Sequence, residues 1–411
     1  MSNNRFYKKN SVNSIVLGKI EKNIVSKIFQ YLFKTGNIRL DFLNYDSVYV
    51  GNGEGELVSI TAPKLIDLMM IILHPNMMFG EKYMQGRLAL TSGDLVKLIC
   101  YVQMPAPYSS FIHNIVDHSN VITKNIQKFN FYIQSKKRAK HYNIDHSFYK
   151  LILDSELQYS CAFFNSPSDS LEVAQQNKIS TIIERLSIDS NCSVLDIGCG
   201  WGRLANNIAL KTKAKVTGIT LSVGQYNFCL QNQNTSSSNA EQNPVFLLED
   251  YKRFLPSQIE SYDRIVSIGM LEHIGPWQYD DYFTGIRQSL KEDGLALIHL
   301  IVKKKPGKTN SWIRKYIFPG CYLPSLSELL VYIEKSGLYM DEIFFHTPSD
   351  YYRTIDYWRN NFYDNMDAVE EKYDEKFIRM FDFYLAGVQS NFTCDIHQMR
   401  IVQIRLKVRC V

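Results

Sequence analysis

From residue 151 onward, short apolar runs alternate with segments that read as helices, and this alternation constrains the fold more than any other feature. The runs are rich in Val, Ile and Leu and have the length of buried strands. They stand at 194–197, 215–220, 245–248, 264–268 and 295–302. Strands that alternate with helices form a mostly parallel sheet covered on both faces, so we predict an α/β fold with a doubly wound sheet. Helical insertions, mainly between 351 and 391, and a last strand at 398–408 complete this region.

The chain is too long for a single core. Its 411 residues suggest two or three domains, and 45% hydrophobic with 21% charged residues are the balance of a soluble globular protein. Prolines at 105 and 107 mark a break in the chain. We therefore predict a small α+β domain over 1–115, a linker over 116–150 and a catalytic domain over 151–411.

The N-terminal domain shows no recognisable chemistry of its own. Residues 1–45 read as an amphipathic helix, because four apolar residues recur on one face with Lys and Glu between them. These residues are Ile20, Ile24, Ile28 and Leu32. A glycine-rich turn then precedes a strand-like run at 57–60, and a helix follows at 64–73.

A glycine-rich loop is the first strong chemical signal. In the run Val194-Leu-Asp-Ile-Gly-Cys-Gly-Trp-Gly202, a buried strand is followed by three glycines that turn the chain into a helix. Glycine lets the backbone approach a ligand at the carboxyl end of a strand, where open α/β sheets bind their ligands. A dinucleotide fingerprint has the spacing G-x-G-x-x-G, whereas this loop has G-x-G-x-G after Asp196. The pattern resembles the first motif of S-adenosylmethionine-dependent methyltransferases; a dinucleotide site and a chance glycine turn are the alternatives.

The end of the second strand departs from the wider methyltransferase pattern. Many of these enzymes place an acidic residue there to hold the ribose hydroxyls, but this strand ends without one. Thr220, Leu221 and Gln225 stand in the region, so a ribose contact must come from an amide or a hydroxyl group. Asp250 and Tyr251 follow the third strand, and we expect them to approach the adenine.

Motifs on both sides of the loop narrow the family. Leu157-Gln-Tyr-Ser-Cys-Ala-Phe-Phe164 precedes it, and it is followed by Tyr262-Asp-Arg-Ile-Val-Ser-Ile-Gly-Met-Leu-Glu-His-Ile-Gly275, Trp312-Ile-Arg-Lys-Tyr-Ile-Phe-Pro-Gly320 and Leu323-Pro-Ser325. In this order they resemble the cyclopropane-fatty-acyl-phospholipid synthase family, which includes the mycolic acid cyclopropane synthases and belongs to the class I S-adenosylmethionine-dependent methyltransferases. The resemblance is dense over 140–411 and weaker at Gly80-Glu-Lys-Tyr-Met84.

This resemblance implies two sets of site residues. The first set contacts S-adenosylmethionine and consists of Tyr159, Ser160, Val194, Asp196, Gly198, Cys199, Gly200, Trp201, Gly202, Thr220, Leu221, Gln225, Asp250, Tyr251 and Lys252. The second set holds a bicarbonate ion and consists of Cys161, Glu272, His299, Ile301 and Tyr351. Four members of the second set also have structural alternatives, namely a buried small cysteine, a helix cap at Glu272, a core histidine and a core tyrosine.

One position argues against a covalent mechanism. Many family members carry a cysteine in a late helix, to which a catalytic role is sometimes assigned. Val388 stands at that position here, and the nearest thiol, Cys394, is six residues further on. A mechanism without a covalent enzyme intermediate, in which bicarbonate is the base, is therefore favoured.

The activity that the resemblance implies is the transfer of a methylene group from S-adenosylmethionine to the cis double bond of an unsaturated phospholipid acyl chain. One alternative is a related methyltransferase that leaves a methyl branch on a lipid or acts on a small soluble molecule. Another is a non-catalytic lipid-binding relative. The intact glycine loop and the complete bicarbonate set argue against the latter.

Composition limits the partners and the location. Eight cysteines without a CxxC pair favour neither a metal site nor a disulfide framework, and a net charge of +5 is too small to argue for nucleic acid. No apolar stretch approaches the ~20 residues of a spanning helix and no signal peptide opens the chain, so we expect a cytoplasmic protein. Basic runs at 136–140 and 303–305 suit lipid phosphates. We therefore expect peripheral association with the inner face of the cell membrane, and the family implies a homodimer.

Overall fold

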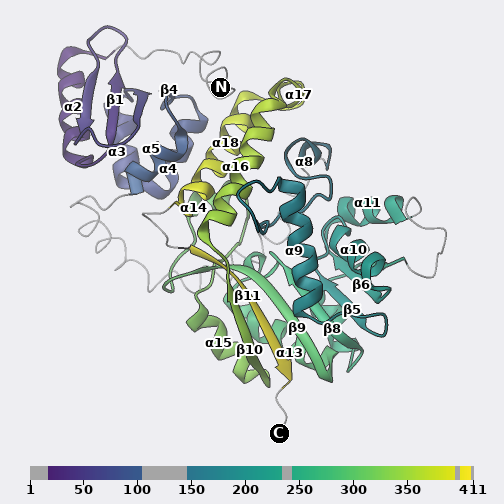
Figure 1. Ribbon diagram of the computed structural model, residues 1–411. Coiled ribbons are helices and arrows are strands. Elements are labelled where there is room, and N and C mark those ends of the chain that lie inside the picture. The colour runs from purple at the N-terminus through teal and green to yellow at the C-terminus, as the bar shows by residue number, and fades with distance from the viewer. Residues whose placement is uncertain (1–16, 104–145, 234–242, 394–398, 409–411) are drawn as a thin grey trace. The chain divides into compact units, whose positions relative to one another are not determined.

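The computed structural model describes residues 17–103, 146–233, 243–393 and 399–408, which form two compact units (Figure 1). The N-terminal unit combines the described residues of Met1–Lys137, Asn310–Pro319 and Ile355–His397. The sheet unit combines those of Arg138–Thr309, Gly320–Thr354 and Gln398–Val411. The expected domain boundaries stay a prediction. Two late segments that we assigned to the catalytic domain fold with the N-terminal unit, because a helical pattern does not reveal which core a helix joins.

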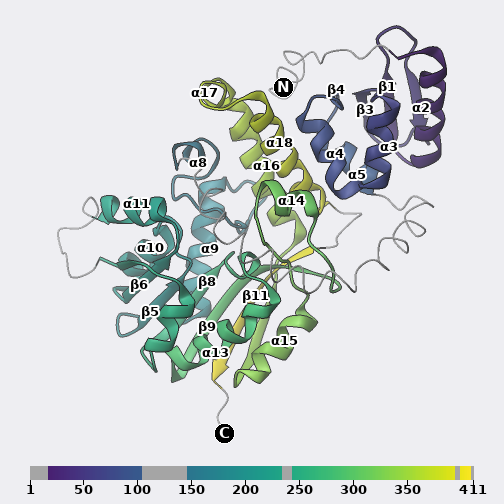
Figure 2. The ribbon, with the colours of Figure 1, turned by 180° about the vertical axis from the view of Figure 1, so that it is seen from behind.

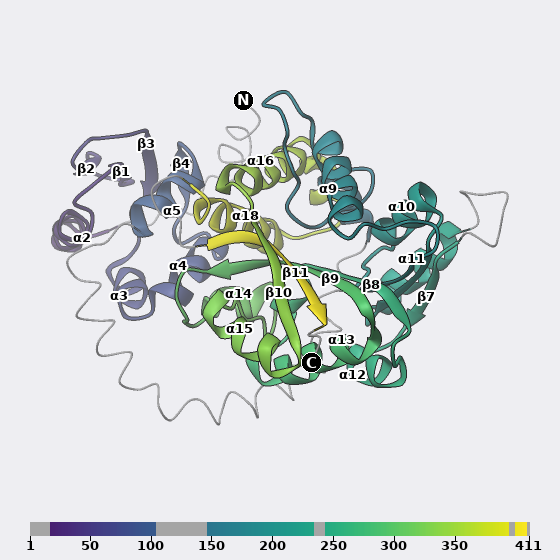
Figure 3. The same ribbon diagram turned by 60° about the horizontal axis from the view of Figure 1, so that its bottom comes forward.

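The sheet unit is built on seven strands. In spatial order they are β10 (Leu338–Phe345), β11 (Met399–Val408), β9 (Leu290–Lys303), β8 (Tyr262–Ile268), β5 (Ser193–Ile197), β6 (Lys215–Thr220) and β7 (Val245–Leu248). The strands from β9 to β7 run parallel, and β11 lies antiparallel between β9 and β10 (Figure 3). The five apolar runs are confirmed as strands, and the mostly parallel, doubly wound α/β sheet is confirmed with them.

Helices cover both faces of this sheet. They are α8 (His146–Ile152), α9 (Leu171–Arg185), α10 (Arg203–Thr212), α11 (Val223–Gln233), α12 (Tyr251–Phe254), α13 (Tyr279–Ser289), α15 (Leu326–Lys335) and the first turns of α16 (Pro348–Asp364). Val194 and Leu297 pack with α9 and α10, whereas Leu195 and Ile298 pack with α13 and α15. Because neighbouring residues of a strand point to opposite faces of the sheet, the apolar strands contribute to one core on each face. Figure 1 views the face of α9, and Figure 2 views the face of α15.

The sequence pattern does not predict β10, because charges interrupt its apolar run. Asp341 and Glu342 stand in its middle, where the register with β11 shifts. Both carboxylates pair with Arg405 of β11, at 2.6 Å and 2.9 Å, and Asp341 also pairs with Lys407 at 3.1 Å. Cross-strand ion pairs of this kind let a polar strand complete the edge of a sheet.

The N-terminal unit contains a four-stranded sheet and several helices. The strands, in spatial order, are β2 (Val48–Gly51), β1 (Asn37–Asp41), β3 (Leu57–Thr61) and β4 (Leu90–Ser92). The helices are α2 (Lys19–Leu32), α3 (Leu65–Leu73), α4 (Pro75–Met84), α5 (Leu95–Gln103), α14 (Ser311–Tyr316), the later turns of α16, α17 (Met366–Glu370) and α18 (Glu375–Ser390). Buried Asp382 in α18 accepts hydrogen bonds from the hydroxyls of Tyr83 in α4 and Tyr363 in α16, so a polar network ties these helices together.

Helix α2 differs from the predicted helix in length and in the face it buries. Of the described residues in 1–45, only Lys19–Leu32 are helical, and Asn37–Asp41 form β1. The predicted apolar face is only partly buried: Ile20 is 78% and Ile24 39% exposed, whereas Ile28 packs partly against the core. Val25 and Phe29 point into the core instead. The spacing of the apolar residues identified a stripe on this helix, but it did not show whether the core of the unit covers that stripe.

None of the helices in the described ranges is both long and apolar enough to cross a membrane. Two features of the sequence, the basic run at 136–140 and Cys394, lie outside the described residues. Of the second basic run, Lys304 and Lys305 are exposed, and the ammonium of Lys303 lies 5.3 Å from the centre of the Tyr322 ring.

Candidate active site

The glycine loop joins the carboxyl end of β5 to the start of α10. The backbone N–H groups of Gly198 and Cys199 both donate to the carbonyl of Ile219 in β6, each at 3.0 Å. Gly198, Gly200 and Gly202 have left-handed φ values of 82°, 56° and 73°, which side-chain-bearing residues adopt only with strain. The loop is therefore held tightly against the parallel strands by its own backbone.

The three glycines have different surroundings. A Cβ at Gly202 would lie 2.5 Å from Phe246, and a Cβ at Gly198 would lie 2.9 Å from Met270, so protein atoms fill both places. No atom lies within 4 Å of a Cβ at Gly200, which faces open space. Of the three, Gly200 is thus the one at which a ligand can lie against the backbone.

Asp196 provides the charge at this loop. It is buried in β5, and its Oδ2 has no hydrogen-bond partner among the described residues. Burial raises its pKa to about 7. A buried carboxyl oxygen that lacks a partner suits a ligand with an ammonium group and repels a phosphate. The residues of the loop therefore fit S-adenosylmethionine better than a dinucleotide.

The residues predicted to contact the ribose and the adenine differ in their burial and in their hydrogen bonds. The Thr220 hydroxyl donates to the amide oxygen of Gln225 at 3.0 Å, which leaves the amide nitrogen of Gln225 facing away from this bond. Asp250 caps α12 by accepting from the N–H of Lys252 at 3.0 Å. The ring of Tyr251 is buried in the core of the α13 face, edge-to-face with Tyr282 at 5.5 Å. Leu221 and Lys252 are exposed.

Residues 158–163 form a strap across the sheet unit that α9 holds in place. The amide of Gln175 donates to the carbonyls of Gln158 and Ser160, at 3.2 Å and 3.1 Å. The ammonium of Lys178 donates to the Ser160 hydroxyl at 2.6 Å. Burial lowers the pKa of Lys178 to about 8, although the negative charge of Asp154 opposes this shift. Lys178 is a site residue that the sequence did not predict, although its place on the apolar stripe of α9 was a signal.

Two aromatic rings accompany this strap near the glycine loop. Tyr149 of α8 lies with its ring centre 5.2 Å from that of Tyr159 and 5.0 Å from that of Trp201. Tyr159 and Trp201 both belong to the predicted cofactor contacts, and Tyr149 joins them in one cluster. An aromatic cluster beside a cationic ligand offers favourable ring faces.

Glu272 lies in a short 3-10 helix, η3 (Leu271–His273), that follows β8. Its Oε1 accepts a hydrogen bond from the backbone N–H of Ile301 in β9 at 2.8 Å, and its Oε2 has no partner among the described residues. Burial raises its pKa to about 7, although the Ile301 N–H opposes the shift. The carboxyl group binds a strand amide and caps no helix, so Ile301 positions Glu272 through its N–H.

His299 is buried two residues before Ile301 in the same strand. Its Nδ1 lies 3.2 Å from the amide nitrogen of Gln403 in β11. An amide nitrogen donates, so Nδ1 accepts and the ring proton belongs on Nε2. Burial, followed by the charges of His346, Lys178 and Arg185, keeps the pKa of His299 well below its usual range. The imidazole is therefore neutral at physiological pH.

Cys161 and Tyr351 complete the second set. The Cys161 thiol is buried and donates to the carbonyl of Ala162 at 3.3 Å, and burial raises its pKa above the usual range. The N–H of Ala162 donates to the hydroxyl of Thr354 at 3.0 Å, one turn after buried Tyr351 in α16. Phe163 next in the strap stacks on the His299 ring at 5.8 Å. The strap thus connects α16 with the histidine of β9.

The contacts within the second set are partly direct and partly indirect. Glu272 and Ile301 are hydrogen-bonded to each other, whereas Cys161 lies in the same strap as Phe163, which stacks on His299. Tyr351 shares α16 with Thr354, which is hydrogen-bonded to Ala162 of the strap. Val388 belongs to α18 in the N-terminal unit and is half-buried. A thiol kept protonated at Cys161 offers no nucleophile.

Solved structures with the same arrangement identify the class. The mycolic acid cyclopropane synthase CmaA1, in complex with SAH and CTAB, aligns with a TM-score of 0.59 at 29% identity, over 66% of this chain and 96% of that chain. The cyclopropane synthase MmaA2 from Mycobacterium tuberculosis aligns with the same TM-score of 0.59 at 27% identity, with the same coverage of 66% and 96%. The sheet order, the glycine loop and these alignments define a class I S-adenosylmethionine-dependent methyltransferase.

Sequence comparison narrows the class to a family. The family described as mycolic acid cyclopropane synthetase matches residues 131–404. The cyclopropane-fatty-acyl-phospholipid synthase of Escherichia coli (strain K12) is 34% identical over 336 residues, which cover 79% of this chain and 81% of that protein. The chain therefore belongs to the mycolic acid cyclopropane synthetase family, and the resemblance noted in the sequence is confirmed.

Proposed function

We propose that the protein is a cyclopropane-fatty-acyl-phospholipid synthase that acts on the cis double bond of unsaturated phospholipid acyl chains with bicarbonate as base. The observation that carries this proposal is the carboxyl group of Glu272. One oxygen is held by a strand amide, the other is buried without a hydrogen-bond partner among the described residues, and a neutral histidine is buried nearby in the same set. The relative from Escherichia coli carries the name of this activity.

The substrate determines what the site must provide. An isolated double bond is a weak nucleophile, so it requires a strong electrophile, and S-adenosylmethionine supplies a methyl group on a sulfonium. Attack on that methyl group would break its bond to sulfur, release S-adenosylhomocysteine and leave a positive charge on the acyl chain. Transfer of a proton from the added methyl group to the base would then close the three-membered ring. The chain must therefore exclude water, face the positive charge with aromatic rings and hold a base near the new methyl group.

The protonation state of Glu272 allows an anion to bind beside it without repulsion between two negative charges. With a pKa of about 7, the carboxyl group retains its proton in a large fraction of molecules at neutral pH. A protonated Oε2 donates a hydrogen bond, so an anion beside it meets a donor and not a second negative charge. His299, with its proton on Nε2, supplies another donor. The hydroxyl of Tyr351 is a third donor in this proposal.

The residues proposed for the electrophile and for the base come from neighbouring strands of the sheet. Asp196 stands in β5 and Gly200 in the loop after it, whereas Glu272 follows β8 and His299 stands in β9. The strap joins the two regions, because Ser160 is assigned to the cofactor and the next residue, Cys161, to the bicarbonate. Lys178 holds Ser160 and thereby positions the strap at their junction.

Product analysis tests the proposal. Purified protein is incubated with labelled S-adenosylmethionine and vesicles of unsaturated phospholipid, and the lipids are analysed by mass spectrometry. We expect acyl chains that gain one CH2 and lose their double bond. A gain of CH2 with the double bond retained supports a lipid methyltransferase that leaves a branch, and no labelled lipid at all contradicts both. Small soluble acceptors are tested in parallel.

Peripheral association with the membrane and a homodimer belong to the same proposal. Lys304 and Lys305 are exposed and suit lipid phosphates, and the sequence has a further basic run at 136–140, outside the described residues. Sedimentation with anionic vesicles should show binding that weakens as salt is raised. Equal binding to neutral and anionic vesicles at every salt concentration would contradict the electrostatic part. Light scattering measures the oligomeric state.

A further inference from the structure

Two neighbouring helices of the N-terminal unit expose apolar side chains that its core does not use. On α3, Ile66, Met69, Met70 and Leu73 are exposed, and their spacing of i, i+3, i+4 and i+7 places them on one face. On α2, Ile20 and Ile24 are exposed as well. We call these six residues the α2–α3 face. Single exposed apolar residues are ordinary, whereas a contiguous set marks an interaction surface.

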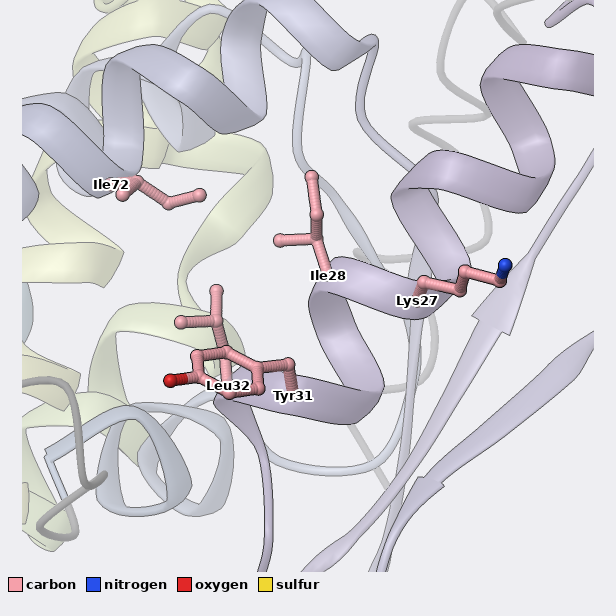
Figure 4. A pocket seen from close by; sticks show the side chains of 5 residues that line it. All are labelled: Lys27, Ile28, Tyr31, Leu32 and Ile72. Atoms are coloured by element: carbon pink, nitrogen blue, oxygen red, sulfur yellow. The ribbon is translucent and has the colours of Figure 1, made fainter.

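A shallow apolar groove connects the two helices (Figure 4). Ile28, Tyr31 and Leu32 of α2 line one side, and Ile72 of α3 points toward them from the other. Asp67 is the only polar residue of α3, and it is buried and ion-paired with Lys82 at 2.8 Å. The outward surface of α3 therefore carries no charge of its own.

Lysines surround this apolar surface. Lys19 precedes Ile20, Lys27 lines the groove and Lys64 precedes α3; all three are exposed and form no ion pair with a described residue. The acidic residue of α2, Glu21, accepts a hydrogen bond from the N–H of Leu65 at 2.8 Å and is thereby engaged within the unit. Apolar side chains bordered by cations are the composition of segments that lie in the interface of an anionic bilayer.

We infer that the α2–α3 face docks on an anionic lipid bilayer, with its apolar side chains in the boundary between headgroups and acyl chains and its lysines at the phosphates. A second copy of this chain suits the face less well, because two such faces would bring the same lysines together. The inference rests on the proposed function, because an enzyme that modifies phospholipid acyl chains must reach a bilayer. The docking itself is measured without turnover.

The test compares variants of the face with matched controls in the full chain. Ile66→Glu combined with Leu73→Glu should lower binding to vesicles of phosphatidylcholine and phosphatidylglycerol by at least about tenfold. Ile259→Glu changes an isoleucine of the sheet unit that is 72% exposed, and it should leave binding unchanged. Lys27→Glu with Lys64→Glu should weaken binding mainly at low salt, whereas exposed Lys376→Glu should not. Ile66→Trp should strengthen binding, because Trp favours the membrane interface.

The outcomes separate this inference from the proposed function. Methylation of detergent-dispersed unsaturated phospholipid should be the same for the double glutamate variant and the wild type, since the variant alters docking alone. Wild-type binding of that variant to anionic vesicles overturns the inference. So does a change of its oligomeric state without vesicles, which would assign the face to a second copy. Vesicle binding that requires the face, together with no methylation of any lipid, would leave the docking standing and refute the proposed function.

Discussion

The two units of the molecule differ in what surrounds their buried carboxyl groups. In the sheet unit, Asp196 and Glu272 each keep a buried oxygen without a hydrogen-bond partner among the described residues, and neither forms an ion pair with a described residue. In the N-terminal unit, buried Asp382 accepts from two tyrosines and buried Asp67 is ion-paired with Lys82 at 2.8 Å, although its Oδ2 has no partner among the described residues; this unit also exposes the apolar α2–α3 face. Buried polar groups left unpaired cost stability and indicate a ligand, while apolar groups left in water indicate a partner.

The largest effect should come from the carboxyl group of Glu272. Glu272→Gln keeps the shape of the side chain but removes its titratable carboxyl group, so we expect turnover to fall by more than about a hundredfold. The affinity for S-adenosylmethionine, measured by calorimetry, should stay nearly unchanged. Tyr351→Phe removes a single donor and should cost about tenfold to a hundredfold, which corresponds to about 1.5–3 kcal/mol.

Two controls accompany this prediction. Val388→Ala should only loosen packing in α18, and Cys394→Ser should be nearly silent. Turnover should also depend on added bicarbonate in carbonate-depleted buffer. Full activity of Glu272→Gln, or loss of activity in Cys394→Ser, would favour a cysteine mechanism. Either result would also remove the contrast between the two units.

The next effect concerns the open space at Gly200. Gly200→Val should lower the affinity for S-adenosylmethionine by at least about a hundredfold, because the side chain enters the space assigned to the ligand. Gly53 in the N-terminal unit also has a left-handed φ, 78°, and open space at its Cβ, so Gly53→Val carries the same backbone strain. Calorimetry on both variants separates the two causes. Unchanged affinity in the Gly200 variant means that the cofactor lies elsewhere.

A smaller effect tests which face of α2 supports the fold. Val25→Ala should reduce the free energy of unfolding by about 2 kcal/mol, because Val25 is fully buried. Ile20→Ala should change it by less than about 0.5 kcal/mol. Denaturant unfolding followed by circular dichroism measures both. Equal losses would mean that Ile20 is covered in solution, and the contrast between the units would weaken.

The smallest effect is a pH dependence. Asp196 has a folded pKa of about 7, above the value of 3.8 for an unperturbed aspartate, so its neutral form stabilises the ligand-free protein at low pH. That contribution is lost as the pH rises from about 4 through about 7. The ionised form suits a cationic ligand, so the affinity for S-adenosylmethionine should fall by up to about tenfold between pH 7 and pH 6. Asp196→Asn should remove this pH dependence; its persistence would assign the proton to another group.

The sequence predicted the parallel strands and the glycine loop because both are local patterns. It did not predict β10, whose charges are neutralised only by Arg405 and Lys407 of a strand far along the chain. The same limit applies at the site. Glu272 and His299 followed from the family resemblance, but the bonds from Ile301 to Glu272 and from Gln403 to His299 each join two different elements of the chain. Contacts between distant segments have no signature in a single sequence.

The apolar period of α2 shows another limit. Ile20, Ile24, Ile28 and Leu32 do form a stripe, yet the core buries Val25 and Phe29, and Ile28 alone of the stripe packs partly against that core. Period reveals that a helix has an apolar side, but a helix with two such sides needs the rest of the fold to choose between them.

The position of β11 has a consequence for how the enzyme is made. This strand comes last of the seven in chain order, yet it lies inside the sheet and carries Gln403, which orients His299. During synthesis, β5 to β9 emerge from the ribosome earlier and can pair, while the free edge of β9 waits for a strand that follows β10 and five helices, α14 to α18. Until β11 has been made, the growing chain therefore holds an open strand edge at β9, and His299 lacks the partner that sets its tautomer.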